Sequence, residues 1–189
     1  GCQTTGSVTI LDDTPPPSGY CTSTGNNTNY EYIEAMSVGD LTNQSGNDGG
    51  YGDHTAQVVT VDLGGTYNVA LTPGFASTVY DETWRIWIDF NHDQDFDDPG
   101  EEVFAPALSN TTVNGSISIP ATASLGTTRM RIAMKWGGTP EPCETFTYGE
   151  VEDYTVDIQQ GGGGGCTAVV IDFNDFEGGW GIWNDGGSD

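Results

Sequence analysis

The sequence contains few basic residues and no long apolar run. Lys and Arg account for 4 of its 189 residues, against 28 Asp and Glu, so the formal net charge is −24. Negative charge of this size repels nucleic acids and anionic lipids. No apolar stretch approaches the roughly 20 residues that a membrane-spanning helix needs. We therefore expect neither a nucleic-acid partner nor membrane insertion.

The sequence also lacks a Cys-x-x-Cys motif and the common catalytic motifs. The four cysteines form no Cys-x-x-Cys pair, which argues against a zinc ribbon and a redox dithiol. Gly-x-Ser-x-Gly and His-Glu-x-x-His do not occur, and neither His54 nor His92 lies beside a nucleophile motif. Paired carboxylates could hydrolyse glycosides, but the sequence does not reveal a carboxyl group with a raised pKa in an apolar cleft. We predict that the chain is not an enzyme.

Aromatic residues are frequent enough to build a core. The 5 Trp, 8 Tyr and 7 Phe can bury more apolar surface than a disordered acidic chain does. The many carboxylates then repel one another in the folded state, and divalent cations neutralise clustered carboxylates. Composition thus predicts a folded protein that uses a metal ion.

Proline and glycine runs divide the chain. Residues 14–18 (Thr-Pro-Pro-Pro-Ser) predict a stiff linker, and five glycines at 161–165 predict a flexible one. We expect residues 1–19 to be an extended linker or strand from a preceding module, residues 20–160 to be one domain, and residues 166–189 to be the incomplete start of another β module or a donated strand. Because the sequence begins with Gly rather than Met, we expect a piece of a longer polypeptide.

The wide spacing of the cysteines favours structural disulfides in an oxidising compartment. Cys21 and Cys143 lie inside the predicted domain, whereas Cys2 and Cys166 lie in the flanking segments. A bond between Cys21 and Cys143 would close nearly the whole domain into one loop. Four cysteines allow three pairings, so this bond is a hypothesis and the pairing of the other two stays open.

Apolar and polar residues alternate with the period of β-strands, and no stretch has a convincing helical period. We therefore predict an all-β protein, a β-sandwich of the jelly-roll or Ig-like kind, with extended N- and C-terminal strand segments. The alternating runs are residues 55–63, 83–90, 113–119, 129–134 and 150–158.

An acidic loop, residues 89–101, follows the second of these runs. Its oxygen-bearing side chains begin on alternate residues, and calcium binds about six to eight oxygens. Compared with a helix-flanked calcium loop, Gln94 stands at the usual glycine position and the closing acid comes one place late. A solvated acidic turn is the alternative, and magnesium fits less well because it keeps its water. The predicted calcium ligands are Asp89, Asn91, Asp93, Asp95, Asp98 and Glu101.

A second acidic group lies at Glu150, Glu152 and Asp153. Glu150 and Glu152 share a strand face with apolar residues, and buried carboxylates need partners. We expect these partners among the basic residues of another run, which are Arg129, Arg131 and Lys135. The alternative is a second metal site, or a contribution of this group to the first.

Residues 148–156 (Tyr-Gly-Glu-Val-Glu-Asp-Tyr-Thr-Val) carry the signature of the GEVED domain, and residues 84–101, 127–132 and 142–146 also resemble that family. The resemblance implies a β-rich accessory module of large surface or secreted bacterial proteins, located outside the cell. Residues 166–189 resemble the opening of a lectin-like jelly-roll module.

The leading functional hypothesis is an extracellular structural or interaction module, stabilised by calcium, in a bacterial surface protein, adhesin or filament. Its expected partners are neighbouring modules or copies of the same protein, through strand exchange or fibre assembly. The alternative is a carbohydrate- or protein-binding accessory module of a secreted hydrolase such as a metalloprotease. For glycans, Trp87, Trp136 and Tyr51 could form a stacking platform, unless they lie in the core.

Four Asn-x-Ser/Thr triplets would mark surface loops if the protein is glycosylated. They are weak predictions, because such triplets often arise by chance in a chain rich in Asn, Ser and Thr. The four asparagines are Asn26, Asn43, Asn110 and Asn114.

Overall fold

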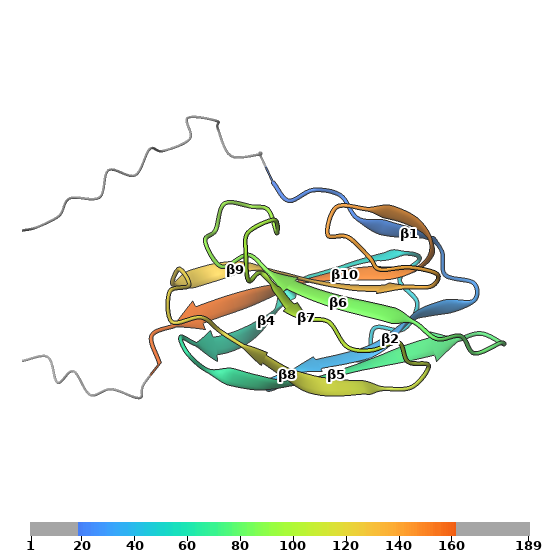
Figure 1. Cartoon of the computed structure of the whole chain (residues 1–189), viewed down its shortest axis with the longest axis horizontal. Coiled ribbons are helices and arrows are strands. Elements are labelled where there is room, and N and C mark those ends of the chain that lie inside the picture. The colour runs from blue at the N-terminus through green and yellow to red at the C-terminus, as the bar shows by residue number, and fades with distance from the viewer. Residues whose placement is uncertain (1–18, 162–189) are drawn as a thin grey trace, which may run out of the picture.

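The computed structural model describes residues 19–161, which form ten β-strands. The strands build two sheets that pack face to face (Figure 1). Their bounds are β1 Thr24–Asn27, β2 Glu31–Val38, β3 Leu41–Asn43, β4 Tyr51–Asp62, β5 Thr66–Phe75, β6 Thr83–Ile88, β7 Glu102–Phe104, β8 Val113–Ser118, β9 Gly126–Lys135 and β10 Thr145–Gln159.

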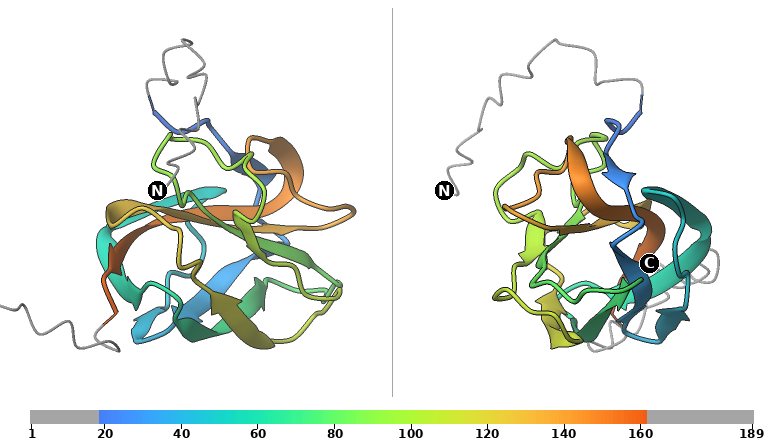
Figure 2. Two further views of the ribbon diagram at one scale, coloured as in Figure 1. Left: turned by 60° about the vertical axis from the view of Figure 1, so that its left-hand side comes forward. Right: turned by 90° about the vertical axis from the view of Figure 1, so that its right-hand side faces the viewer.

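Strand β10 organises the larger, six-stranded sheet. On one side it pairs antiparallel with β9, and the order continues through β6 to β7. On its other side β1 pairs with the first part of β10 and β4 with the rest, both in parallel. The smaller sheet, in the order β3-β2-β5-β8, is antiparallel throughout (Figure 2).

The main core lies between the two sheets. It contains inward residues of both, among them Trp84 and Ile86 from β6 and Ile33 from β2. On the outer face of the larger sheet a second apolar cluster joins Trp87 to Phe96 of the acidic loop. The prediction of an all-β sandwich is confirmed, and each alternating run coincides with a strand.

Half of the strands were not among the predicted runs. Strand β5 contains Pro73 and Gly74, which usually mark the end of a strand. The register of β5 against β2 shifts between Ile33 and Ala35, opposite this segment. Strand β2 contains two Glu and one Ala, residue types that are depleted in strands. Packing of these strands against the larger sheet decides their conformation.

A disulfide joins Cys21, just before β1, to Cys143, just before β10, which confirms that predicted bond. It ties together two segments separated by 122 positions in the sequence. Residues 1–18 and 162–189, which include Cys2, Cys166 and nearly all of the predicted flanking segments 1–19 and 161–189, lie outside the described residues. Among the residues that are described, none forms a helix that could cross a membrane.

Candidate metal centre

The acidic loop connects β6 to β7 and stands on the outer face of the larger sheet (Figure 1). Its first carboxylate, Asp89, is fully buried. Asp89 Oδ1 accepts a hydrogen bond from His92 N (2.7 Å), and Oδ2 accepts from Gln94 N (3.1 Å) and the Tyr20 hydroxyl (2.6 Å). Both oxygens of Asp89 are therefore used to fold the loop.

The next three polar residues form a series of local turns. The side-chain oxygens of Asn91, Asp93 and Asp95 each accept a hydrogen bond from the backbone N–H two residues later. His92 and Gln94, between them, have φ values of 68° and 75°. Glycine adopts such values at little cost, whereas other residues do so rarely. Gln94 stands where helix-flanked calcium loops usually have glycine, and the left-handed backbone at this position explains why glycine is preferred there.

These turns bring three carboxylates together. Oxygens of Asp93, Asp95 and Asp98 lie within 4.8 Å of one another. The Asn91 amide donates to Asp93 Oδ2 (2.8 Å) and Asp98 Oδ2 (2.5 Å), which holds two of the three in place. Loss of solvent, followed by the charges of Asp93 and Asp95, raises the pKa of Asp98. The group has the donor atoms of a hard-cation site.

Glu101 closes the loop in a different way. Its Oε1 accepts a hydrogen bond from Phe90 N at 2.7 Å, while Oε2 is buried and has no hydrogen-bond partner within residues 19–161. Burial raises the pKa of Glu101 to about 7. Of the six predicted ligands, the structure thus gathers Asp93, Asp95 and Asp98, with the Asn91 side chain beside them. Asp89 and Glu101 bind backbone N–H groups at the two ends of the loop.

The loop is fixed to the sheet by an aromatic residue. Phe96 is buried in the outer apolar cluster, and its ring stacks on Tyr20 with 5.2 Å between centroids. The guanidinium groups of Arg131 and Arg129 lie over the Phe96 and Tyr20 rings, respectively. This packing gives the acidic loop a rigid base.

In the second acidic group, Asp153 forms ion pairs with arginines of the same sheet. Asp153 is fully buried and forms a two-point ion pair with Arg131, with distances of 2.7 Å from Nε to Oδ1 and 2.8 Å from Nη2 to Oδ2. Arg129 also contacts it, at 3.2 Å. The third guanidinium nitrogen of Arg131, Nη1, donates to the carbonyl oxygens of Cys21 and Pro142. Arg131 therefore links β10 to both segments that the disulfide joins.

Glu150 has no basic partner among the described residues. Its carboxylate accepts from three backbone N–H groups, those of Ile33 (2.9 Å), Asp48 (2.7 Å) and Gly50 (3.2 Å). The expectation that Arg129, Arg131 and Lys135 would pair with Glu150 and Glu152 is wrong. The two arginines face Asp153 on the opposite side of β10, and Lys135 pairs with Glu144.

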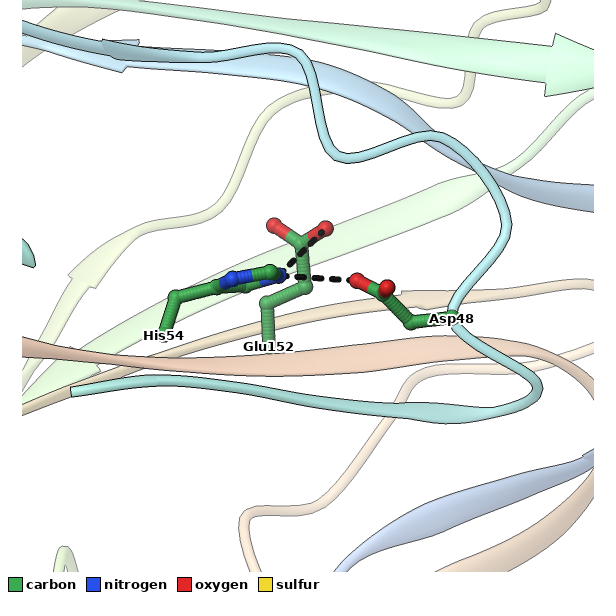
Figure 3. Close-up of side chains that lie close together, drawn as sticks. All are labelled: Asp48, His54 and Glu152. Atoms are coloured by element: carbon green, nitrogen blue, oxygen red, sulfur yellow. Dashed lines mark hydrogen bonds and ion pairs between the residues drawn. The ribbon is translucent and has the colours of Figure 1, made fainter. Parts of the chain in front are cut away.

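Glu152 lies in a cluster with Asp48 and His54 (Figure 3). His54 Nε2 is 2.8 Å from Asp48 Oδ2 and 3.8 Å from Glu152 Oε1. Burial raises the pKa of Glu152 to about 7. No pattern in the sequence linked His54 to Asp48 and Glu152. Only the parallel pairing of β4 with β10 brings these residues together.

An aromatic groove lies at one end of the sandwich. Tyr30, Tyr80, Trp136 and Tyr148 line it together with Glu31, and its volume is about 320 Å³. Neighbouring rings meet edge to face, with centroids 5.7 to 5.8 Å apart. The exposed fraction of both Tyr30 and Trp136 is 44%.

The three residues predicted to form a stacking platform, Trp87, Trp136 and Tyr51, do not share one open surface. Trp87 is buried in the outer cluster, and the Tyr51 hydroxyl donates to Asp153. Trp136 alone belongs to an open aromatic surface, the groove.

The side chains of Asn26, Asn110 and Asn114 are exposed, in keeping with surface triplets. Asn43 differs, because it is partly buried and its amide donates to the Tyr154 hydroxyl at 2.9 Å. A glycan on Asn43 would disturb this contact.

The comparisons with known proteins concern both the acidic loop and β10. No curated protein sequence matches the chain. Among solved structures, the CARDB domain of a Pyrococcus furiosus protein, crystallised in complex with di-metal ions, is similar at 10% identity and a TM-score of 0.35, over 78% of this chain and 99% of that domain. Residues 83–157 match the family model of the GEVED domain. The match runs from β6 through the acidic loop into β10 and confirms the resemblance to this family noted in the sequence.

Proposed function

We propose that the chain is an extracellular structural and interaction module whose acidic loop binds calcium. The observation that carries this proposal is the convergence of Asp93, Asp95 and Asp98 to within 4.8 Å on a loop held by its own backbone hydrogen bonds. Like charges held this close repel one another unless a cation lies between them. Calcium removes this repulsion and so stabilises the folded loop.

Calcium suits the loop better than magnesium does. Calcium accepts six to eight oxygens in irregular arrangements at about 2.3–2.6 Å, whereas magnesium requires near-octahedral geometry and retains water. The loop offers carboxylate oxygens of unequal exposure, since Asp93 and Asp95 are partly buried and Asp98 is exposed. Water molecules and backbone carbonyls would complete the shell.

Thermal unfolding with calcium and with a chelator tests this proposal. Calcium at a hundredfold excess over its dissociation constant stabilises the folded state by about 2.7 kcal/mol. We expect Asp95→Asn to abolish the calcium-dependent rise of the melting temperature. Asp97→Asn is the matched control, because Asp97 is exposed in the same loop but does not belong to the converging group. Equal melting curves with calcium and chelator in the wild type would refute the proposal.

The extracellular location and a structural role have independent support. The Cys21–Cys143 disulfide suits an oxidising compartment, and GEVED domains are modules of the extracellular type. A buried ion pair between Asp153 and Arg131 and an acidic loop stiffened by calcium would suit a module that transmits force between its neighbours or copies of itself. Electron microscopy of the native material tests this part. We expect ordered fibres or surface assemblies that contain the chain, and a uniformly dispersed monomer in calcium would contradict it.

The aromatic groove favours a second candidate, binding of carbohydrate. Rings of Tyr30, Tyr80, Trp136 and Tyr148 could stack against sugar rings, and the Glu31 carboxylate at the groove could accept hydrogen bonds from hydroxyl groups. A glycan array with wild type and Trp136→Ala tests this candidate. Binding that Trp136→Ala abolishes would support it, and the absence of any glycan signal would leave the structural role alone.

A further inference from the structure

The cluster of Asp48, His54 and Glu152 has the composition of a transition-metal site. It offers one imidazole nitrogen and two carboxylate oxygens, all within 4.8 Å of one another. The nitrogen lies 2.8 Å from one oxygen and 3.8 Å from the other. Ligands at the usual Zn–N and Zn–O distances of about 2.0–2.2 Å in a tetrahedron lie about 3.4 Å apart. The two observed distances bracket this value.

One donor of the cluster is buried without a partner. The Glu152 side chain is fully buried, and Oε1 has no hydrogen bond to any described residue. The other oxygen, Oε2, accepts from the Tyr154 hydroxyl at 2.7 Å, and the Asn43 amide donates to that same hydroxyl. This arrangement holds the carboxylate with Oε1 directed at His54, as Figure 3 shows. Leaving a buried acceptor without a partner costs stability unless a ligand satisfies it.

Glycine at position 52 keeps the space around the cluster free. In the parallel register Gly52 faces Glu152, and His54 faces Tyr154. A Cβ atom on Gly52 would collide with Asp48 Oδ2 and would lie 2.7 Å from His54 Nε2. Any other residue at this position would displace the donors.

The side chains of Asp48 and His54 are held in place before any ion binds. The backbone of Asp48 and Gly50 donates to Glu150, and Asn47 is linked to Thr28 by two hydrogen bonds, so the loop that carries Asp48 is fixed. The His54 ring stacks on Tyr154 with 5.2 Å between centroids. A site whose ligands are held in this way loses little conformational freedom when it binds.

We propose that Asp48, His54 and Glu152 bind one divalent transition-metal ion of the zinc type, at a site separate from the acidic loop. Imidazole nitrogen with carboxylate oxygen suits zinc, whereas calcium prefers oxygen ligands alone. Three protein ligands leave a fourth coordination position for water or for a donor from a neighbouring module.

Calorimetric titration of the full chain with Zn²⁺, in the presence of saturating calcium, tests the proposal. Saturating calcium competes for sites made of carboxylates alone, so zinc that still binds reports a site with a nitrogen or sulfur ligand, and the variants assign that ligand. We expect one zinc ion per chain. His54→Gln and Glu152→Gln should each weaken zinc binding by at least about tenfold. Because Glu152→Gln changes a buried residue, the melting curve of this variant is recorded as well. The variant Asp48→Asn, which changes an exposed residue of the same cluster, gives a second measurement of zinc affinity.

His92 provides the matched control, because it is the other of the two histidines and lies in the acidic loop. His92→Gln and Asp95→Asn should leave zinc affinity unchanged. Loss of zinc binding in His92→Gln, with retention in His54→Gln, would overturn the proposal, as would the absence of any zinc binding. In the latter case the contacts of His54 with Asp48 and Glu152 are contacts within the protein alone.

Discussion

The two acidic regions of this domain use their carboxylates in opposite ways. On β10, Asp153 faces two arginines and Glu150 accepts from three backbone N–H groups, so protein donors neutralise or solvate each charge. In the acidic loop, Asp93, Asp95 and Asp98 meet one another, and no described basic side chain forms an ion pair with them. The density of acidic residues is similar, but the three loop carboxylates, unlike Asp153, have no basic side chain to neutralise them among the described residues.

Removing a protein partner on β10 should have the largest effect. Arg131→Leu leaves the buried Asp153 with Arg129 as its one remaining cation among the described residues, and breaking a buried ion pair costs about 3–5 kcal/mol. Chemical denaturation checks this, with Arg85→Leu as control, because Arg85 pairs with the half-exposed Glu102. We expect the control to change stability by at most about 1 kcal/mol. Equal effects would contradict the distinction between the two regions.

Loss of the disulfide should come next. The double variant Cys21→Ser with Cys143→Ser should lower the free energy of unfolding by about 2–5 kcal/mol, because the bond restricts a long loop of the unfolded chain. The effect should be the same with and without calcium. If it appeared only with calcium present, the disulfide and the acidic loop would be coupled, contrary to the present account.

Glu82 offers a third case, a buried carboxylate with neither donors nor a converging group. Both of its oxygens lack hydrogen-bond partners among residues 19–161, and burial raises its pKa from 4.5 to about 8. The folded state therefore holds a proton that the unfolded state has lost between these values. The stability due to this group is complete below pH 4.5 and is lost as the pH rises through about 8.

Glu82→Gln should remove this pH dependence. Relative to wild type, the variant should gain stability from pH 5 to pH 9, by about 1–3 kcal/mol at the upper end, because a neutral amide replaces a buried charge. Denaturation curves across this range measure the gain. The exposed Glu141→Gln is the control and should show no such trend. A gain that does not vary with pH would contradict the assigned pKa shift.

Gln94→Gly should have the smallest effect, because it relieves one residue of a left-handed conformation with φ of 75°. The gain of about 1 kcal/mol or more is offset in part by the freedom that glycine adds to the unfolded chain. We expect a net stabilisation below about 1 kcal/mol in the melting curve. Gln57→Gly in strand β4 should instead destabilise by about 0.5–1 kcal/mol. If both variants destabilise equally, the loop does not require the left-handed backbone at position 94.

The sequence predicted those features that depend on neighbouring residues. Alternation along residues 83–90 identified β6, and oxygen-bearing residues at alternate positions identified a loop in which Asp93 and Asp95 converge. Features that depend on strand pairing were not predictable in this way. The choice of Asp153 over Glu150 and Glu152 as the arginine partner follows from which face of β10 meets the core.

The position of β4 beside β10 was equally hidden, because parallel partners are far apart in sequence. It brings His54 near Glu152 and makes a cluster that no local motif announces. The contrast between Asp89 and Asp93 shows the same limit on a smaller scale. Both belong to one alternating series, yet burial turns the oxygens of Asp89 toward backbone N–H groups, while Asp93 joins the converging carboxylates.

Calorimetric titration with calcium measures most directly whether the acidic loop is a metal site. We expect one binding event in the wild type, its loss in Asp95→Asn and its retention in Asp97→Asn. Each of these substitutions removes one negative charge from the same loop. Calcium binding that both substitutions weaken equally would show that calcium responds to the net charge of −24 rather than to the converging carboxylates. Binding that neither substitution affects would show that calcium does not use these carboxylates. Either result would contradict the account.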